Sequence, residues 1–89
     1  MSKALIACRV LPGLFPNEYY VMVNGSSAYY VSREDVTVRS IPDQDRPVDG
    51  FVYGYIVEAA DGWTLVQLPG EAVLGGIRTW VEDSAVQAA

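Results

Sequence analysis

The side chains able to do acid–base chemistry in this chain are almost all carboxylates. The sequence has no histidine, so it lacks the commonest general base and the commonest metal ligand. The neighbouring acids Glu34-Asp35 and Glu82-Asp83 could in principle flank a glycosidic bond, as the two carboxylates of a glycosidase do. Adjacent residues of one helical turn point apart, however, and acids at the start of a turn are expected from the helix dipole. An enzyme that uses these carboxylates ranks last, and we predict a non-enzymatic protein without a cofactor.

Three more carboxylates lie close together in the sequence just before a glycine. Oxygen ligands around a loop glycine are typical of calcium-binding loops. A proline and a valine stand where further ligands belong, and no glutamate closes the loop. We favour a solvated acidic loop over a metal site and keep cation binding as the alternative for Asp43, Asp45 and Asp49.

Cys8 is the single cysteine, so no disulfide can form within the chain. This fits a reducing compartment, and we expect a cytoplasmic protein in which Cys8 is a small buried residue of the first strand. The stretch Leu5–Cys8 is too short for the apolar region of a lipoprotein signal peptide. No apolar run approaches the ~18 residues of a membrane-spanning helix.

Charge is scarce in the chain and its balance is acidic. The 89 residues carry a formal net charge of -5, with 51% hydrophobic and 19% charged residues. The six basic residues are dispersed, which disfavours nucleic acid and anionic membranes as partners, because those partners bind through clustered Lys and Arg. So small and apolar a domain is expected to expose an apolar patch, and such patches mark interfaces. We therefore predict a homo-oligomer or the binding of another protein.

Aromatic residues are the best candidates for the contact surface. Tyr and Trp are enriched at interface hot spots because they bury much area and keep a polar tip. The alternative is packing in the core, which we expect for at least half of these residues. Leu14 and Phe15, in a loop between two prolines, line a binding groove or, as we favour, form a lid over an open end of the core. The aromatic candidates are Tyr20, Tyr30, Tyr53, Tyr55, Trp63 and Trp80.

The elements that position these residues are short strands joined by tight turns. Asp61-Gly62 divides the β-rich stretch 51–68 and predicts a type I′ hairpin, because both residues tolerate positive φ angles. Asn24-Gly25 predicts a second hairpin between strands 19–23 and 28–31. We expect further strands at 4–11, 37–39 and 77–81, single helical turns at 32–36 and 82–86, loops at 12–18, 41–50 and 69–76, and a frayed tail.

A weak internal repeat accompanies these elements. Tyr30-Val31 with Val36 matches Trp80-Val81 with Val86, 50 residues later. Each copy has an aromatic-Val strand end, an acidic helical turn and a closing Val. We interpret both turns as plugs at the ends of one barrel.

The segment 76–86 resembles the end of SH3-like barrels, where a glycine-led strand runs into one helical turn and a final hydrophobic residue. The resemblance covers roughly the last forty residues and implies an all-β fold. We predict one domain, residues 1–89, an SH3-like small barrel or sandwich of about six or seven short antiparallel strands, with 41–50 as a polar connecting loop. The family's peptide-binding use does not carry over, because the first strand and the following loop lack its signature.

Three functions are therefore compared. The first is a non-enzymatic interaction or assembly module that uses its aromatic and aliphatic strand surface. The second is a small-molecule-binding barrel with Leu14, Phe15 and the loop 69–76 at an apolar mouth. The third is the carboxylate enzyme.

Overall fold

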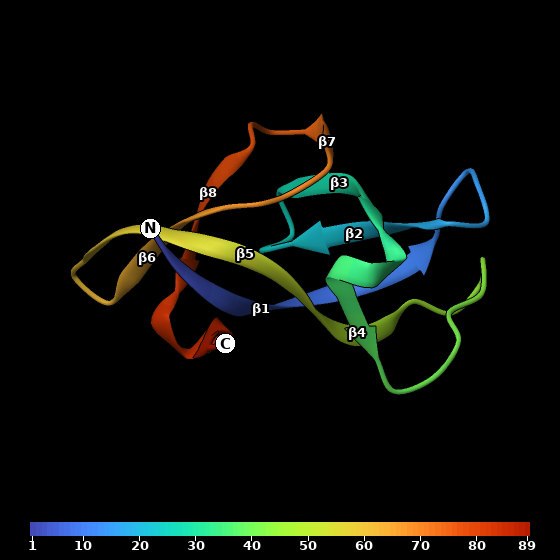
Figure 1. Cartoon of the computed structure of the whole chain (residues 1–89), viewed down its shortest axis with the longest axis horizontal. Helices are drawn as coiled ribbons and strands as arrows, with labels where there is room; N and C mark the ends of the chain where they lie inside the picture. Colours follow the sequence, from blue (N-terminus) through green and yellow to red (C-terminus); the bar gives the residue numbers. More distant parts are fainter.

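The computed structural model of the chain describes all 89 residues and is entirely β apart from two single 3₁₀ turns, η1 and η2 (Figure 1). Its nine strands form one antiparallel sheet that curls into a small barrel-like fold. The elements in order are β1 (Ser2–Pro12), β2 (Glu18–Val23), β3 (Ser27–Ser32), η1 (Arg33–Asp35), β4 (Val36–Val38), β5 (Val48–Ala60), β6 (Trp63–Gln67), β7 (Glu71–Leu74), β8 (Arg78–Glu82), η2 (Asp83–Ala85) and β9 (Val86–Ala88).

One short segment of chain connects the two end strands of the sheet. The strand order is β7-β3-β2-β1-β5-β6-β8, with β4 added to β5 and β9 added to β1. Although β7 and β8 lie at opposite ends of this order, only Gly75, Gly76 and Ile77 separate them. Tyr29 on β3 donates its hydroxyl to the Gly76 carbonyl at 2.8 Å, which ties this crossing to the core.

The two long strands β1 and β5 pair along most of their length and form the centre of the sheet. On the face that points inward, Ile6 opposes Val52, and small residues stand on both sides of this pair, Ala4 opposite Gly54 and Cys8 opposite Gly50. A Cβ at Gly54 would lie 2.7 Å from both the Gln67 carbonyl oxygen and Ile6 Cδ1. The small residues therefore let neighbouring strands and side chains close over β1 and β5.

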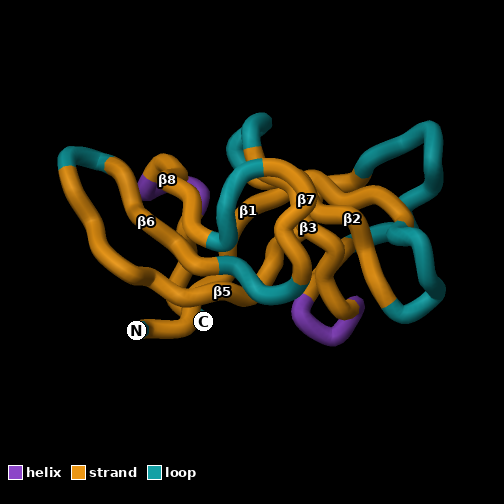
Figure 2. The backbone as a smooth tube through the Cα atoms, turned by 90° about the horizontal axis from the view of Figure 1, so that it is seen from above, coloured by secondary structure: helices purple, strands orange, loops and turns teal.

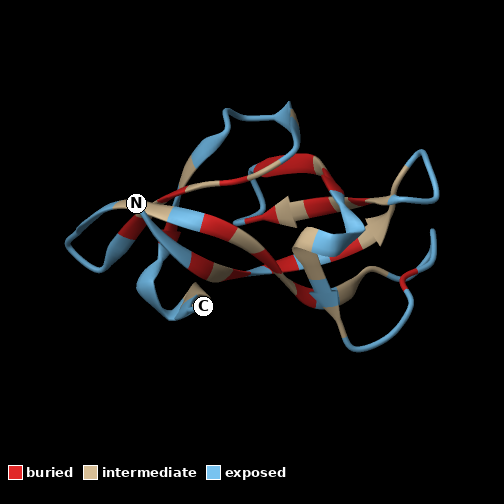
Figure 3. Cartoon of the chain, viewed as in Figure 1, coloured by how far each residue is buried: buried red, intermediate tan, exposed pale blue.

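The core is a layer of branched side chains enclosed by the curled sheet. Alternation along β2 puts Tyr19, Val21 and Val23 inside, as the two-residue period of a strand requires. Twelve buried residues form one cluster. Figure 3 shows this burial concentrated along the central strands, while the hairpin tips are exposed.

The chain consists of two halves with the same plan. Residues 1–38 run through β1, β2, β3, η1 and β4, and residues 48–89 run through β5, β6, β8, η2 and β9, with β7 as an insertion. Equivalent hydrogen bonds recur: the Arg33 amide donates to the Asn17 carbonyl, and the Asp83 amide donates to the Gly62 carbonyl, both at 3.0 Å. The repeat seen at Tyr30-Val31 and Trp80-Val81 is thus confirmed as part of a longer duplication.

The two halves exchange their last strands. The final strand of the first half, β4, pairs with β5, and the final strand of the second half, β9, pairs with β1. Val36 consequently opposes Val52, and Val86 opposes Ile6. Figure 2 shows η1 and η2 as two helical segments well apart from each other.

Both predicted hairpins are confirmed. Asn24 and Gly25 have φ angles of 59° and 68°, and Asp61 and Gly62 have 55° and 86°, the left-handed values that type I′ turns need. The first strand and the two helical turns also lie where we expected them.

Five expectations about the strands and loops were wrong. There are nine strands rather than six or seven, and β1 and β5, with 11 and 13 residues, are not short. The stretch 69–76 contains β7, because its backbone finds a partner in β3, and the tail contains β9, because it pairs with β1. The polar loop occupies 39–47 and not 41–50, since β5 already begins at Val48.

The structure contains no helix with the length and apolar character needed to cross a membrane.

Candidate binding surface

None of the six aromatic candidates is buried. Tyr19 and Tyr29 are the aromatic residues of the core, whereas Tyr20 and Tyr30 occupy the neighbouring outward positions of the same strands. The expectation that at least half of the candidates pack in the core was therefore wrong. The candidates alternate with the core residues, so the pleat turns all of them toward the outside.

The first aromatic surface lies on β6 and β8. Trp80 opposes Leu65, and Trp63 opposes Glu82 in the next row, so the two indoles share one face. They are 42% (Trp63) and 38% (Trp80) exposed. Together with Asn24, Ala60 and Asp61 they line a shallow surface depression of about 430 Å³. We call this depression the indole hollow.

Hydrogen bonds from three turns fix the walls of the indole hollow. Asn24, in the β2–β3 turn, donates its side-chain amide to the Trp80 carbonyl at 2.8 Å. The Asp83 amide donates a hydrogen bond to the Gly62 carbonyl. The Thr64 hydroxyl donates a hydrogen bond of 2.7 Å to the Asp83 carboxylate. The backbone on both sides of the hollow is therefore held by residues distant in sequence.

The charge around the indole hollow is mainly negative. Asp61 lines the hollow, Glu82 opposes Trp63, and Glu58 opposes Leu65. The second half of the chain, residues 48–89, has six acids and one base, so it carries the whole net charge of -5, while residues 1–38 have three of each. That one base, Arg78, lies two residues before Trp80 on the same outward face of β8. It donates to the amide oxygen of Gln67 at 3.0 Å and pairs with no carboxylate.

The second aromatic surface lies on β2 and β3. Tyr20 opposes both Leu11 and Tyr30, and the two tyrosine rings meet edge-to-face with centroids 5.4 Å apart. Leu11, Tyr20 and Tyr30 join Leu14 and Val73 around a hollow of about 380 Å³. We call this the tyrosine hollow.

Leu14 and Phe15 do not form a lid over the core. They are 71% and 64% exposed, at the tip of the loop 13–17. The loop is held by Glu18, whose carboxylate accepts the Leu14 amide at 3.1 Å. The lid expectation was wrong because the core is already closed by strands, and Leu14 instead reaches the tyrosine hollow.

Tyr53 and Tyr55 belong to neither hollow. Tyr53 lies on the outer face of β5, with the Lys3 ammonium 4.7 Å from its ring centroid. Tyr55 opposes Gln67, one row along the outer face from Leu65. The other predicted residues thus separate into Trp63 with Trp80 and Tyr20 with Tyr30.

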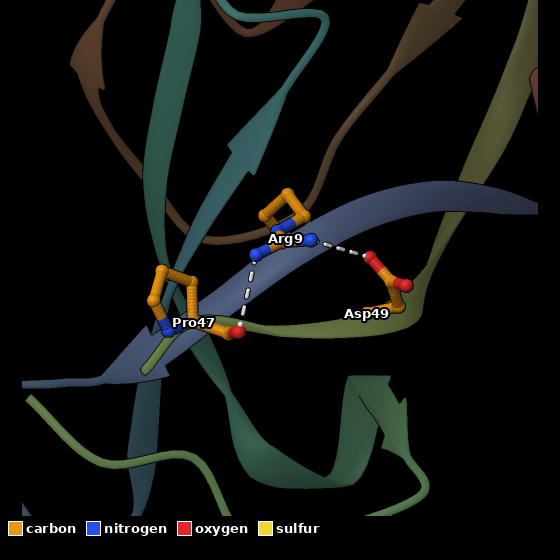
Figure 4. A network of polar contacts seen from close by, with 3 residues as sticks. All are labelled: Arg9, Pro47 and Asp49. Atoms are coloured by element: carbon orange, nitrogen blue, oxygen red, sulfur yellow. Dashed lines mark hydrogen bonds and ion pairs between the residues drawn. The ribbon is translucent and has the colours of Figure 1, made fainter. Parts of the chain in front are cut away.

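The acidic loop is arranged by its own hydrogen bonds. Asp43 accepts the Asp45 amide at 2.9 Å. Asp49 pairs with Arg9 at 3.0 Å, and the same guanidinium donates to the Pro47 carbonyl at 3.2 Å (Figure 4). The structure brings no three potential metal ligands together.

Cys8 is buried in the core cluster, as predicted. Burial, with a smaller contribution from the Asp49 carboxylate, raises the pKa of its thiol to about 12. The thiol therefore stays protonated and unreactive at neutral pH.

Sequence reasoning missed Asn24, Leu65 and Val73 as residues of these surfaces. Asn24 carries a strong turn signal that hides its second role as a donor to β8. Leu65 follows from simple alternation with the buried Thr64 and Val66. Val73 had no signal, because β7 was expected to be a loop.

Searches with protein-family models, among curated proteins and among solved structures found no match to this chain.

Proposed function

We propose that the protein is a non-enzymatic interaction module that assembles with itself or with another protein through its outward-facing aromatic residues. The observation that carries the proposal is the pair of outward-facing aromatic hollows on one sheet. The loops beside them, at Asp61-Gly62 and at 13–17, lie at opposite ends of the molecule (Figure 1). A module with two separated contact surfaces is suited to assembly.

The fold we propose for this module is an SH3-like barrel. Its support is the course of the chain from Gly76 through β8 and η2 to β9, which follows the glycine-led strand, single turn and closing hydrophobic residue of that family. A strand, a single 3₁₀ turn and a second strand also follow one another from β3 through η1 to β4.

The proposal is tested by the mass of the protein in solution. Light scattering after size-exclusion chromatography is expected to give a mass above the 9.7 kDa of one chain. Trp80→Ala or Tyr30→Ala should shift the mass toward the monomer, because each removes the centre of one hollow. Tyr53→Ala is the matched control, since Tyr53 lies on the same sheet but outside both hollows.

Circular dichroism must show that all three variants remain folded. If Trp80→Ala and Tyr30→Ala together leave the mass of an oligomer unchanged, the aromatic surfaces do not form the contact and the proposal is wrong.

A second candidate function is the binding of an apolar small molecule. It is favoured by the tyrosine hollow, which brings Leu14 and the 69–76 segment together through Val73. A thermal-shift screen of apolar compounds should then find ligands whose stabilisation is lost in Tyr20→Ala. The absence of any ligand in a broad screen, or equal stabilisation of the variant, would count against this function.

A further inference from the structure

We infer that the indole hollow receives a guanidinium group from a positively charged segment of a partner protein. The inference rests on the proposed function, because the hollow must be a contact surface, and it adds the chemistry of the partner. Two observations carry it: the geometry of the indoles and the charge around them.

The geometry of the hollow suits a flat cation. Trp63 and Trp80 present their rings on one face of adjacent strands, and Ala60 leaves space beside them. Indole is the ring that attracts cations most strongly, through the negative potential of its face. A guanidinium is planar and weakly hydrated, so it stacks on such rings more readily than an ammonium does.

The surrounding charge favours a cation and disfavours an anion. Asp61 stands at the wall of the hollow, and Glu82 lies directly across from Trp63. The one ion pair of the chain is Arg9 with Asp49, so neither Asp61 nor Glu82 is neutralised within the protein. A partner cation would have two free carboxylates beside the rings, while an acidic group placed at the same point would be repelled by them.

The tyrosine hollow differs from the indole hollow in its rings and in its charge. Its nearby carboxylate, Glu18, is bonded to the Leu14 amide, and its half of the chain has balanced charges. Glu71 opposes Tyr30 across β3 and β7 and has no ion-pair partner, so the tyrosine hollow has one free carboxylate on a cross-strand neighbour. The indole hollow has Asp61, Glu82 and Glu58 around it, so the two hollows differ in their rings and in the number of free carboxylates.

The two indoles also provide the measurement. The chain has two tryptophans, so its proton–nitrogen NMR spectrum has two indole N–H signals that report on the hollow. The probe is the peptide acetyl-Gly-Arg-Gly-Arg-amide, and the matched probe replaces each arginine by citrulline, which has the same shape without the charge. We expect both indole signals to shift and saturate with the arginine peptide and to stay in place with the citrulline peptide.

Charge-neutralising variants test the role of the carboxylates. Asp61→Asn keeps the turn, because Asn-Gly also forms type I′ turns, and Glu82→Gln keeps the shape of the side chain. The double variant should weaken binding about fivefold at low salt, as expected from two exposed charges. Glu34→Gln with Asp35→Asn, at the other 3₁₀ turn, should leave the affinity unchanged.

The outcomes separate this inference from the proposed function. Equal shifts with the citrulline peptide, or unchanged affinity in the Asp61→Asn, Glu82→Gln variant, would overturn the cation site but leave self-assembly, measured by mass, untouched. If acetylarginine amide binds as tightly as the arginine peptide, the claim that the hollow binds a charged segment is wrong. If a lysine peptide binds as tightly as the arginine peptide, the claim that the hollow prefers guanidinium is wrong. A monomeric protein whose indoles bind the arginine peptide would retain the inference and leave a partner protein as the function of the module.

Discussion

The indole hollow and the tyrosine hollow occupy equivalent places in the two halves of the molecule, yet their chemistry differs. Trp80 stands where the first half has Tyr30, and Leu65 stands where it has Tyr20. Trp63, next to the turn at Gly62, corresponds to Glu18, next to the loop 13–17. Two rows of outward positions therefore distinguish the surface of the first half from the surface of the second half, for which we propose a cation site.

The connections beside the two hollows differ in the same way. In the first half, the Glu18 carboxylate accepts a hydrogen bond from the backbone of the loop 13–17. In the second half, the tight turn Asp61-Gly62 needs no side-chain bond, so the Asp61 carboxylate stays free. The carboxylate at the tight turn is thus available to a partner, whereas the carboxylate beside the longer loop is hydrogen-bonded within the chain.

The largest effect is expected at the centre of the sheet, where the halves carry different small residues. Gly54→Ala should destabilise the protein by about 2–3 kcal/mol, because the new Cβ would lie 2.7 Å from both the Gln67 carbonyl oxygen and Ile6 Cδ1. The nearest counterpart in the first half is Cys8, which already has a Cβ, so Cys8→Ala should cost only about 1 kcal/mol. Urea unfolding measures both changes. Similar urea midpoints for Gly54→Ala and the natural protein would show that a Cβ is tolerated at Gly54 as it is at Cys8, and that the two halves are packed alike at these positions.

The two hairpin turns should differ next. Asn24→Asp replaces the donor of the 2.8 Å bond to the Trp80 carbonyl by an acceptor and should cost about 1 kcal/mol. Asp61→Asn, the reverse exchange at the other turn, removes no hydrogen bond and should change stability by less than about 0.5 kcal/mol. Both residues tolerate the positive φ of their turns, so thermal unfolding of the two variants isolates the bond to β8. Equal stability of both variants would mean that Asn24 acts only as a turn residue.

The smallest expected effect is on the pH dependence of stability, and it arises at Cys8 in the first half. Burial raises the pKa of Cys8 from 9.0 to about 12, so above pH 9 the unfolded chain loses the thiol proton and the folded chain keeps it. Stability therefore falls as the pH rises between these values, by less than about 1 kcal/mol at pH 9.5 relative to pH 7. Cys8→Ala should remove this part of the alkaline loss, measured by urea unfolding at both pH values. An unchanged pH dependence in the variant would place the alkaline loss elsewhere, for example at Tyr29, whose pKa burial also raises.

Local signals in the sequence determined the turns and the central strands. Asn24-Gly25 and Asp61-Gly62 predict their hairpins because few dipeptides accept the required φ angles. The duplication was visible as the match of Tyr30-Val31 to Trp80-Val81. These features depend on residues that are near one another in the chain.

The missed elements depend on partners far away in the sequence. The chain around Val73 is rich in glycine and becomes a strand only because β3 offers an edge, and Val86 begins a strand only because β1 does. Alternation likewise separates Tyr19 from Tyr20 but does not reveal which face is the core. The hollows could not be predicted for the same reason, since the closure of the sheet brings Asn24 beside Trp80.

The most direct test of this account is the mass of the natural protein across a range of concentrations, measured by sedimentation equilibrium. The account predicts a mass that rises above 9.7 kDa with concentration and falls back when Trp80 and Tyr30 are both replaced by alanine. A mass of one chain at every concentration, with no protein retained on the arginine peptide, would contradict the claim that the exposed aromatic residues are contact surfaces.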